Sequence, residues 1–180
     1  SVPDDKEECK KRINEGLAFD ALITSGGVSV GEHDLVLGIL KSLAVEILFW
    51  KVNIKPGMPM AFGVSKTGVP VFALPGNPVS TMVTFLRFVR PGLEKRGGVA
   101  GPGNEIRLKA TLADPLRKKD SKRHFIRGVL GNERGGLVVH TTGSQSSGVL
   151  TSLTKANCFI ILPEESEGVN AGEEVEIELI

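Results

Sequence analysis

The chain has 180 residues, with 22 lysine and arginine residues, 21 aspartate and glutamate residues, and a formal net charge of +1 at pH 7. A charge so near zero argues against a surface for duplex nucleic acid or for an anionic membrane. No apolar run reaches the roughly 20 residues that a membrane-spanning helix needs. Two cysteines in unrelated contexts, Cys9 and Cys158, favour a reducing compartment over a disulfide framework. We therefore expect a cytoplasmic protein with no nucleic-acid or membrane partner.

Helical and strand patterns alternate in the first part of the chain. Their apolar spacing predicts, in order, a helix at 5–17, a strand at 19–24, a helix at 34–43, strands at 45–50, 60–64 and 69–74, and a helix at 79–90. Asn77 followed by Pro78 is a strong signal for a helix start, and Pro91 should end or kink the last helix. This alternation predicts a mostly parallel sheet covered by helices.

A loop rich in glycine and serine follows the first predicted strand. Gly26 and Gly27 allow the backbone to approach a ligand, Ser25 and Ser29 supply hydroxyl groups, and the next helix points its free N–H groups to the same place. Asp34 adds a carboxylate, a common arrangement where Mg²⁺ bridges protein and phosphate. The loop is either such an anion site or a tight turn that needs glycine for its geometry alone.

A second loop, at 74–80, follows the last predicted strand of this part. In parallel sheets, ligands gather outside the carboxyl ends of the strands. Both loops are expected at that edge, and so is Asp4 if residues 1–3 close a strand. Their convergence is more informative than either loop alone.

The composition changes at 96–103, where glycines indicate a linker. No helical period follows, and the pattern predicts strands at 105–112, 125–130, 137–140, 158–162 and 175–179. Short strands separated by turns suggest a small β-barrel or sandwich. We therefore divide the chain into an α/β domain at 1–98 that is incomplete at its N-terminus, a linker at 99–104, and an all-β domain at 105–180.

Five motifs occur together in this chain. They are the loop at 25–34, the Lys55-Pro56-Gly57 turn, the segment 74–80, the segment 125–128 and the segment 142–147. In this order and spacing they resemble the molybdopterin molybdenumtransferase family, which includes bacterial MoeA, the E domain of the plant homologue and the E domain of gephyrin. The resemblance implies an α/β fold: a three-layer α/β/α molybdopterin-binding domain, truncated at its front, followed by a small barrel-like all-β domain.

This resemblance implies an enzyme of molybdenum cofactor biosynthesis. Such transferases insert molybdate into adenylylated molybdopterin and release AMP, with Mg²⁺ as cofactor, and work as homodimers. Full members of the family are about twice as long, so the 180 residues alone are expected to be weakly active or inactive. Two alternatives stay open: a scaffold or partner-binding module on the same fold, and a molybdopterin adenylyltransferase, whose family shares the α/β fold but lacks the β-domain.

Residue roles follow from the same resemblance. Asp34, Lys51 and Lys55 match catalytic positions, and Asp34 with Asp4 matches the metal site. The positions that match substrate-binding residues are Ser25, Gly26, Gly27, Ser29, Asn77, Ser80, Arg127 and Ser147. In the family, the matching arginine and serine complete an oxyanion site across the domain cleft. An arginine suits that role because its planar group presents several donors to a tetrahedral anion.

Met58 departs from the family pattern, which commonly has a lysine in this turn. A methionine cannot donate to molybdate, so either another cation compensates or the anion site is weaker. A basic cluster at 117–123 is expected to be a solvated, mobile hairpin, since no aromatic residues accompany it for nucleic-acid binding.

Overall fold

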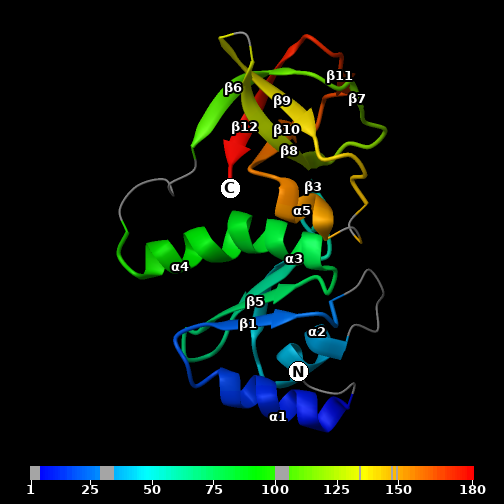
Figure 1. The fold of residues 1–180 in the computed structure, drawn as a ribbon. Helices are drawn as coiled ribbons and strands as arrows, with labels where there is room; N and C mark the ends of the chain where they lie inside the picture. Colours follow the sequence, from blue (N-terminus) through cyan, green and yellow to red (C-terminus); the bar gives the residue numbers. More distant parts are fainter. Residues whose placement is uncertain (1–4, 29–34, 100–105, 134, 147, 149) are drawn as a thin grey trace. The chain divides into compact units, whose positions relative to one another are not determined.

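The computed structural model describes residues 5–28, 35–99, 106–133, 135–146, 148 and 150–180. The chain forms two compact units, which are described separately (Figure 1). The first comprises Ser1–Val52 and Gly57–Gly98, and the second comprises Asn53–Pro56 and Val99–Ile180. Within the described residues, no helix is long and apolar enough to cross a membrane.

The first unit alternates helices and strands as its sequence predicts. Its elements are α1 (Lys6–Gly16), β1 (Leu22–Ser25), α2 (Leu35–Ser42), β2 (Glu46–Trp50), β4 (Ala61–Val64), β5 (Pro70–Leu74), α3 (Pro78–Thr84), the π-helical turn η1 (Phe85–Val89) and α4 (Arg90–Arg96). Asp5 caps α1 by accepting a hydrogen bond from the Glu8 N–H at 2.8 Å.

The sheet of this unit has the strand order β1-β5-β4-β2. Strands β1, β5 and β2 run in one direction and β4 runs against them, so the described sheet has one parallel pair, β1 with β5. The expectation of a mostly parallel sheet is therefore wrong, because two of the three strand pairs in the described sheet are antiparallel. The cause is the turn at 65–69, where the Ser65 N–H donates to the Val69 carbonyl, because parallel neighbours need a far longer crossover.

Helices cover both faces of this sheet, which gives three layers. Alternate residues of β5 enter different cores: Val71 and Ala73 face the core under α1 and α2, while Phe72 and Leu74 face the core that includes Val89 of η1. This strand is buried on both sides, as a central strand of an α/β sheet must be. The α/β/α arrangement predicted from the sequence is confirmed.

Pro91 does not end the last helix of this unit. The chain stays helical from Pro78 to Arg96, with the π-helical turn η1 just before the proline. The Arg90 N–H donates to the Phe85 carbonyl, five residues back. A proline in a regular helix clashes with the carbonyl four residues earlier, and a π-turn changes the position of those carbonyls. The helix therefore accommodates Pro91 as an early residue of α4.

The second unit is built mainly of strands. Its elements are β3 (Ile54–Lys55), β6 (Arg107–Leu112), β7 (Leu116–Arg117), β8 (Arg123–Glu133), β9 (Gly136–Thr141), α5 (Thr151–Lys155), β10 (Cys158–Leu162), β11 (Gly168–Val169) and β12 (Glu174–Leu179). The short helix α5 contradicts the expectation that no helix follows the linker. Five residues are too few to show a helical period in the sequence.

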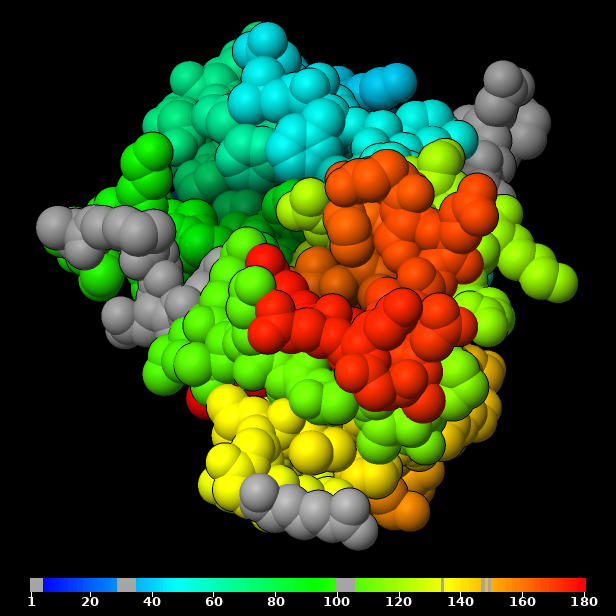
Figure 2. Space-filling view, turned by 90° about the horizontal axis from the view of Figure 1, so that it is seen from above, coloured from blue at the N-terminus to red at the C-terminus, as the bar shows by residue number. Residues whose placement is uncertain are grey.

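Five strands of this unit close into a barrel in the order β10-β12-β6-β9-β8, because β8 also pairs with β10. On the surface shown in Figure 2, the carboxyl-terminal strand lies against β6, in agreement with their antiparallel register. The barrel predicted from the sequence is confirmed. Its interior is apolar and includes Leu112, Ile126, Val139, Ile160 and Ile177.

Candidate functional site

The carboxyl ends of β1 and β5 lie side by side and form a corner of two loops. The Gly26 N–H donates to the Leu74 carbonyl at 3.1 Å, and the strand register places Ser25 opposite Leu74. Gly26 and Gly27 have φ angles of 90° and 68°, which favour glycine. A Cβ atom on Gly76 would lie 3.1 Å from the Gly26 Cα, so this close approach favours glycine at position 76.

The second loop leads into α3 through Asn77. Its side-chain oxygen accepts from the N–H groups of Val79 (3.2 Å) and Ser80 (3.4 Å), and Pro78 follows as the first helical residue. This is the helix start that the sequence predicts. Because the cap uses the Asn77 oxygen, the amide nitrogen is the part of this side chain that is left for a ligand. Ser80 is buried in the first turn.

Thr81, which the sequence did not indicate, links the two loops. Its hydroxyl donates to the carbonyls of Pro75 and Asn77, and lies 3.5 Å from the Ser25 hydroxyl. Ser25 also donates to the Pro75 carbonyl at 3.4 Å. The sequence does not distinguish Thr81 from other threonines in the first turn of a helix. Its role comes from the neighbouring strand β1, which carries Ser25.

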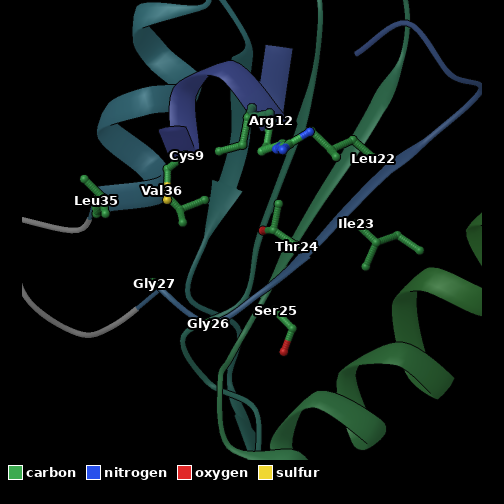
Figure 3. A pocket seen from close by; sticks show the side chains of 11 residues that line it. Cys9, Arg12, Leu22, Ile23, Thr24, Ser25, Gly26, Gly27, Leu35 and Val36 are labelled. Atoms are coloured by element: carbon green, nitrogen blue, oxygen red, sulfur yellow. The ribbon is translucent and has the colours of Figure 1, made fainter. Parts of the chain in front are cut away.

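A cavity of about 390 Å³ adjoins the first loop on the side of α1 (Figure 3). Thr24 and Arg12 point to this side, whereas the Ser25 hydroxyl is directed toward α3. The Thr24 hydroxyl oxygen is buried and has no hydrogen-bond partner among the described residues. Gly26 and Gly27 line the cavity, and the Gly26 N–H also joins this loop to β5 through the Leu74 carbonyl.

Lys51 follows β2, which lies at the opposite side of the sheet from β1. Its backbone has a φ angle of 69°, and its N–H donates to the Met60 carbonyl at 2.9 Å. The ammonium lies 4.2 Å from the ring centroid of Trp50, a cation–π contact that fixes its direction.

Lys55 belongs to the second unit, although β2 and β4, which precede and follow its strand in the sequence, belong to the sheet of the first unit. Its strand β3 pairs in parallel with β8, and its ammonium lies 3.1 Å from Asp120 Oδ2. The other carboxylate oxygen lies 2.7 Å from His124 Nε2 and accepts the Lys122 N–H at 3.1 Å. Mainly through His124, these groups lower the pKa of Asp120 below the ordinary range of a carboxyl group.

The basic cluster at 117–123 is not a solvated hairpin, so that expectation is wrong. Lys118 is buried, and its ammonium donates to the carbonyls of Glu164 (2.6 Å) and Ser166 (3.1 Å). Arg123 pairs with the Glu164 carboxylate at 3.1 Å. Partners distant in sequence hold these two side chains, and a local charge pattern does not reveal such partners.

Arg127 is 1% exposed and lies on β8. Its guanidinium donates to the Ser152 hydroxyl at 3.1 Å and the Ser146 carbonyl at 3.2 Å, and no described carboxylate forms an ion pair with it. Burial lowers the pKa of this guanidinium. The Gln145 carboxamide accepts the Arg127 N–H at 2.9 Å and donates to its carbonyl at 3.2 Å. The carboxamide therefore makes the two backbone hydrogen bonds that a neighbouring strand would make, and these fix the backbone of Arg127.

Four residues expected in the site, Asp4, Ser29, Asp34 and Ser147, lie outside the described residues. Within the part of the chain that the structure describes, no group of three or more histidine, cysteine, aspartate or glutamate residues could hold a metal ion. The structure brings Ser25, Gly26, Gly27, Asn77 and Ser80 together at one end of the first sheet. Lys55 and Arg127 belong to the second unit.

Comparison with known families assigns each part of the chain. The family model described as "Probable molybdopterin binding domain" matches residues 1–95, which is more than half of the chain. The chain belongs to this molybdopterin-binding family. Residues 109–180 match a second model, described as "MoeA C-terminal region (domain IV)".

Individual relatives of this chain agree with the assignment. It is 39% identical over 179 residues to a molybdopterin molybdenumtransferase of Haemophilus influenzae, and the match covers 98% of this chain and 44% of the relative. A gephyrin of Dictyostelium discoideum is 34% identical over 99% of this chain and 28% of its own length. A MoeA crystal structure from Pyrococcus horikoshii superposes with a TM-score of 0.78 at 31% identity, covering 99% of this chain and 42% of that one. The chain thus spans less than half the length of these relatives.

Proposed function

We propose that this chain carries part of the active centre of a molybdopterin molybdenumtransferase, which inserts molybdate into adenylylated molybdopterin and releases AMP. One observation carries the proposal: a molybdopterin-binding match and a MoeA C-terminal match follow each other along one chain, and a relative named molybdopterin molybdenumtransferase aligns with nearly all of it. We place the domains at 1–98 and 105–180, with the linker at 99–104, and count residues 53–56, which pack with the second unit, as an excursion from the first domain. The barrel unit speaks against the adenylyltransferase alternative, since that family lacks a β-domain.

In this proposal the corner of the first unit holds the phosphates of the nucleotide. The backbone N–H of Gly27, the Ser25 hydroxyl and the Asn77 amide are donors, and they suit the charged oxygens of a phosphate. Ser29 belongs to the same loop, and Ser80 and Lys51 are assigned to molybdate or phosphate. The φ angles of Gly26 and Gly27 support this role, because a residue without a Cβ atom lets a ligand come close to the backbone.

The second unit contributes cationic groups. The buried guanidinium of Arg127 has neutral partners and no described counter-ion, so a tetrahedral oxyanion would supply the missing negative charge. We assign Ser147 to the same anion. Lys55, whose side chain is 60% exposed, is the cation assigned to neutralise charge on the departing AMP or on molybdate.

Three further features of the proposal rest on the family resemblance. Mg²⁺ would neutralise phosphate charge when bound, with Asp34 and Asp4 as its ligands, because carboxylate oxygens are the donors that this ion prefers. The complete protein is proposed to be a cytoplasmic homodimer. Because the chain spans less than half of its relatives, we propose that the 180 residues alone have little turnover.

The test is AMP release from adenylylated molybdopterin by the complete protein, with and without molybdate. Lys55→Met should lower the molybdate-dependent rate by about tenfold or more, because it removes a positioned cation. Lys109→Met is the matched control, since Lys109 also forms one ion pair on this unit, with Glu174 at 2.6 Å. The control should retain its rate. Molybdate-independent AMP release, or equal rates in both variants, would refute the proposal.

A further inference from the structure

The carboxylate of Asp120 is shared by two groups that carry or can carry positive charge. Its Oδ2 accepts from the Lys55 ammonium at 3.1 Å, and its Oδ1 lies 2.7 Å from His124 Nε2. The Lys122 N–H also donates to Oδ1, at 3.1 Å. Both carboxylate oxygens are therefore occupied. None of the family motifs in the sequence contains Asp120 or His124.

Strand pairing places these groups together. In the register of β3 with β8, Lys55 lies opposite His124 and Ile54 lies opposite Arg123. The Asn53 amide donates to the Ser121 carbonyl at 2.9 Å, which fixes the turn that carries Asp120. The side chain of His124 is 11% exposed and that of Asp120 is 26% exposed. Solvent therefore reaches Lys55 far more readily than its two partners.

An anion that approaches Lys55 must compete with Asp120 for the ammonium. When Lys55 turns to the anion, the half-buried carboxylate loses its ion pair with the ammonium, which is unfavourable in a poorly solvated place. An imidazole titrates near neutral pH and responds to such changes in nearby charge. Because a carboxylate only accepts hydrogen bonds, His124 Nε2 carries hydrogen toward Asp120, and Nδ1 is the atom that can accept a further proton.

We propose that Asp120 positions Lys55 for anion binding and that His124 takes up a proton when the Lys55 ammonium moves from Asp120 to the anion. The proton comes from solvent, binds at Nδ1 and returns to solvent when the anion leaves. Asp120 and His124 are thus positioning residues, and Lys55 is the residue that touches the anion. The choice of molybdate as the anion rests on the proposed function.

Other charged side chains near Asp120 have partners of their own, so His124 is the group expected to respond when Lys55 moves. Arg123, its neighbour on β8, is paired with Glu164, and the Lys118 ammonium is directed at the carbonyls of Glu164 and Ser166. On β10 the residue opposite His124 is Leu162, which has no charge. The charged groups that contact the His124–Asp120 pair through described side chains are therefore Lys55 and the pair itself.

The experiment is calorimetric titration of the chain with molybdate at neutral pH, repeated in buffers of different ionisation enthalpy to count the protons taken up. The unaltered chain should take up a fraction of a proton, up to about one, for each molybdate bound. His124→Gln can still hydrogen-bond to Asp120 but cannot take up the proton, so its proton uptake should fall to near zero. Asp120→Asn, which removes the shared charge, should do the same. His140→Gln is the matched control, because His140 Nε2 also faces a carboxylate, that of Glu133 at 2.9 Å.

The outcomes separate this inference from the proposed function. Binding of molybdate with the same proton uptake in the unaltered chain and in His124→Gln overturns the inference alone. Loss of proton uptake in His140→Gln as well as in His124→Gln also overturns it. Absence of molybdate binding in the unaltered chain contradicts the proposed function and the inference together. Circular dichroism confirms that each variant is folded, and Asp120→Asn gives an independent reading if His124→Gln does not fold.

Discussion

Replacing Gly76 with alanine tests how closely the ends of β1 and β5 must approach. The new Cβ atom would lie 3.1 Å from the Gly26 Cα and 3.7 Å from the Gly26 nitrogen, both of which belong to the backbone. The φ angle of Gly76 is outside the range that favours glycine, so an alanine is strained by this contact and not by its own backbone. The two loops must therefore separate by a few tenths of an ångström, which weakens the hydrogen bond from Gly26 to Leu74.

The cost of this change can be estimated from two opposing effects. Overpacking costs about 1–3 kcal/mol, and alanine recovers about 0.4–1 kcal/mol by restricting the unfolded chain. From the middle of both ranges, the first unit should lose about 1.3 kcal/mol of its free energy of unfolding, which corresponds to roughly 5–10 °C in melting temperature for a unit of this size. Because small displacements of positioned groups lower rates strongly, molybdate-dependent turnover of the complete protein should fall about tenfold or more.

Thermal unfolding followed by circular dichroism, together with the AMP-release assay, measures both effects. Gly38→Ala is the matched control in the same unit: Gly38 lies within α2, nothing lies within 4 Å of its added Cβ, and alanine should stabilise the helix by up to about 1 kcal/mol. An unchanged melting temperature and an unchanged rate in Gly76→Ala would refute the account of this corner.

Three further predictions concern the described residues. Asn77→Ala should cost about 0.5–2 kcal/mol in urea unfolding because it removes the cap of α3, and Asn77→Ser should restore most of it; equal stability of all three proteins would remove the cap from the account. Gly128→Ala should cost about 1–3 kcal/mol, since its Cβ would lie 2.9 Å from Val139 inside the barrel, whereas Gly131→Ala on the same strand meets nothing within 4 Å and should be nearly neutral; similar losses in both would contradict this packing. Because the pKa of folded Asp120 is lowered, its carboxylate contributes stability above the ordinary pKa of about 4 and loses it as pH falls further; Asp120→Asn should therefore lose less stability below pH 4 than the unaltered chain, and parallel pH profiles would show that the carboxylate contributes nothing.

Local sequence patterns predicted those parts of the fold that depend on neighbouring residues. The Asn77-Pro78 helix start and the alternating strands of the barrel follow from caps and periodicity, which act over a few residues. The pairings of β4 were predicted less well, because the direction of a strand depends on the turn at 65–69 and not on the strand itself. Pro91 misled for a related reason: η1, which accommodates it, has no local sequence signature.

The residues of the candidate site also divide into those that local sequence patterns predict and those that depend on contacts with distant residues. Gly26, Gly27 and Asn77 were found because glycine and capping residues have conformational preferences that are visible in the sequence. Asp120, 65 residues beyond Lys55, was not found, since only the pairing of β3 with β8 brings the two side chains together. The basic cluster was misread for the same reason, because the carbonyls that bind Lys118 lie 46 and 48 residues away.

In the proposed function, the corner formed by β1 and β5 holds the phosphate of a nucleotide. A titration of the isotope-labelled chain with AMP, followed by nuclear magnetic resonance, tests it most directly. We expect saturable shifts of the amide signals of Gly26, Gly27 and Gly76, with no comparable change at Gly131 in the barrel. Saturable binding that leaves the three corner amides unchanged, or no binding at millimolar AMP, would contradict it.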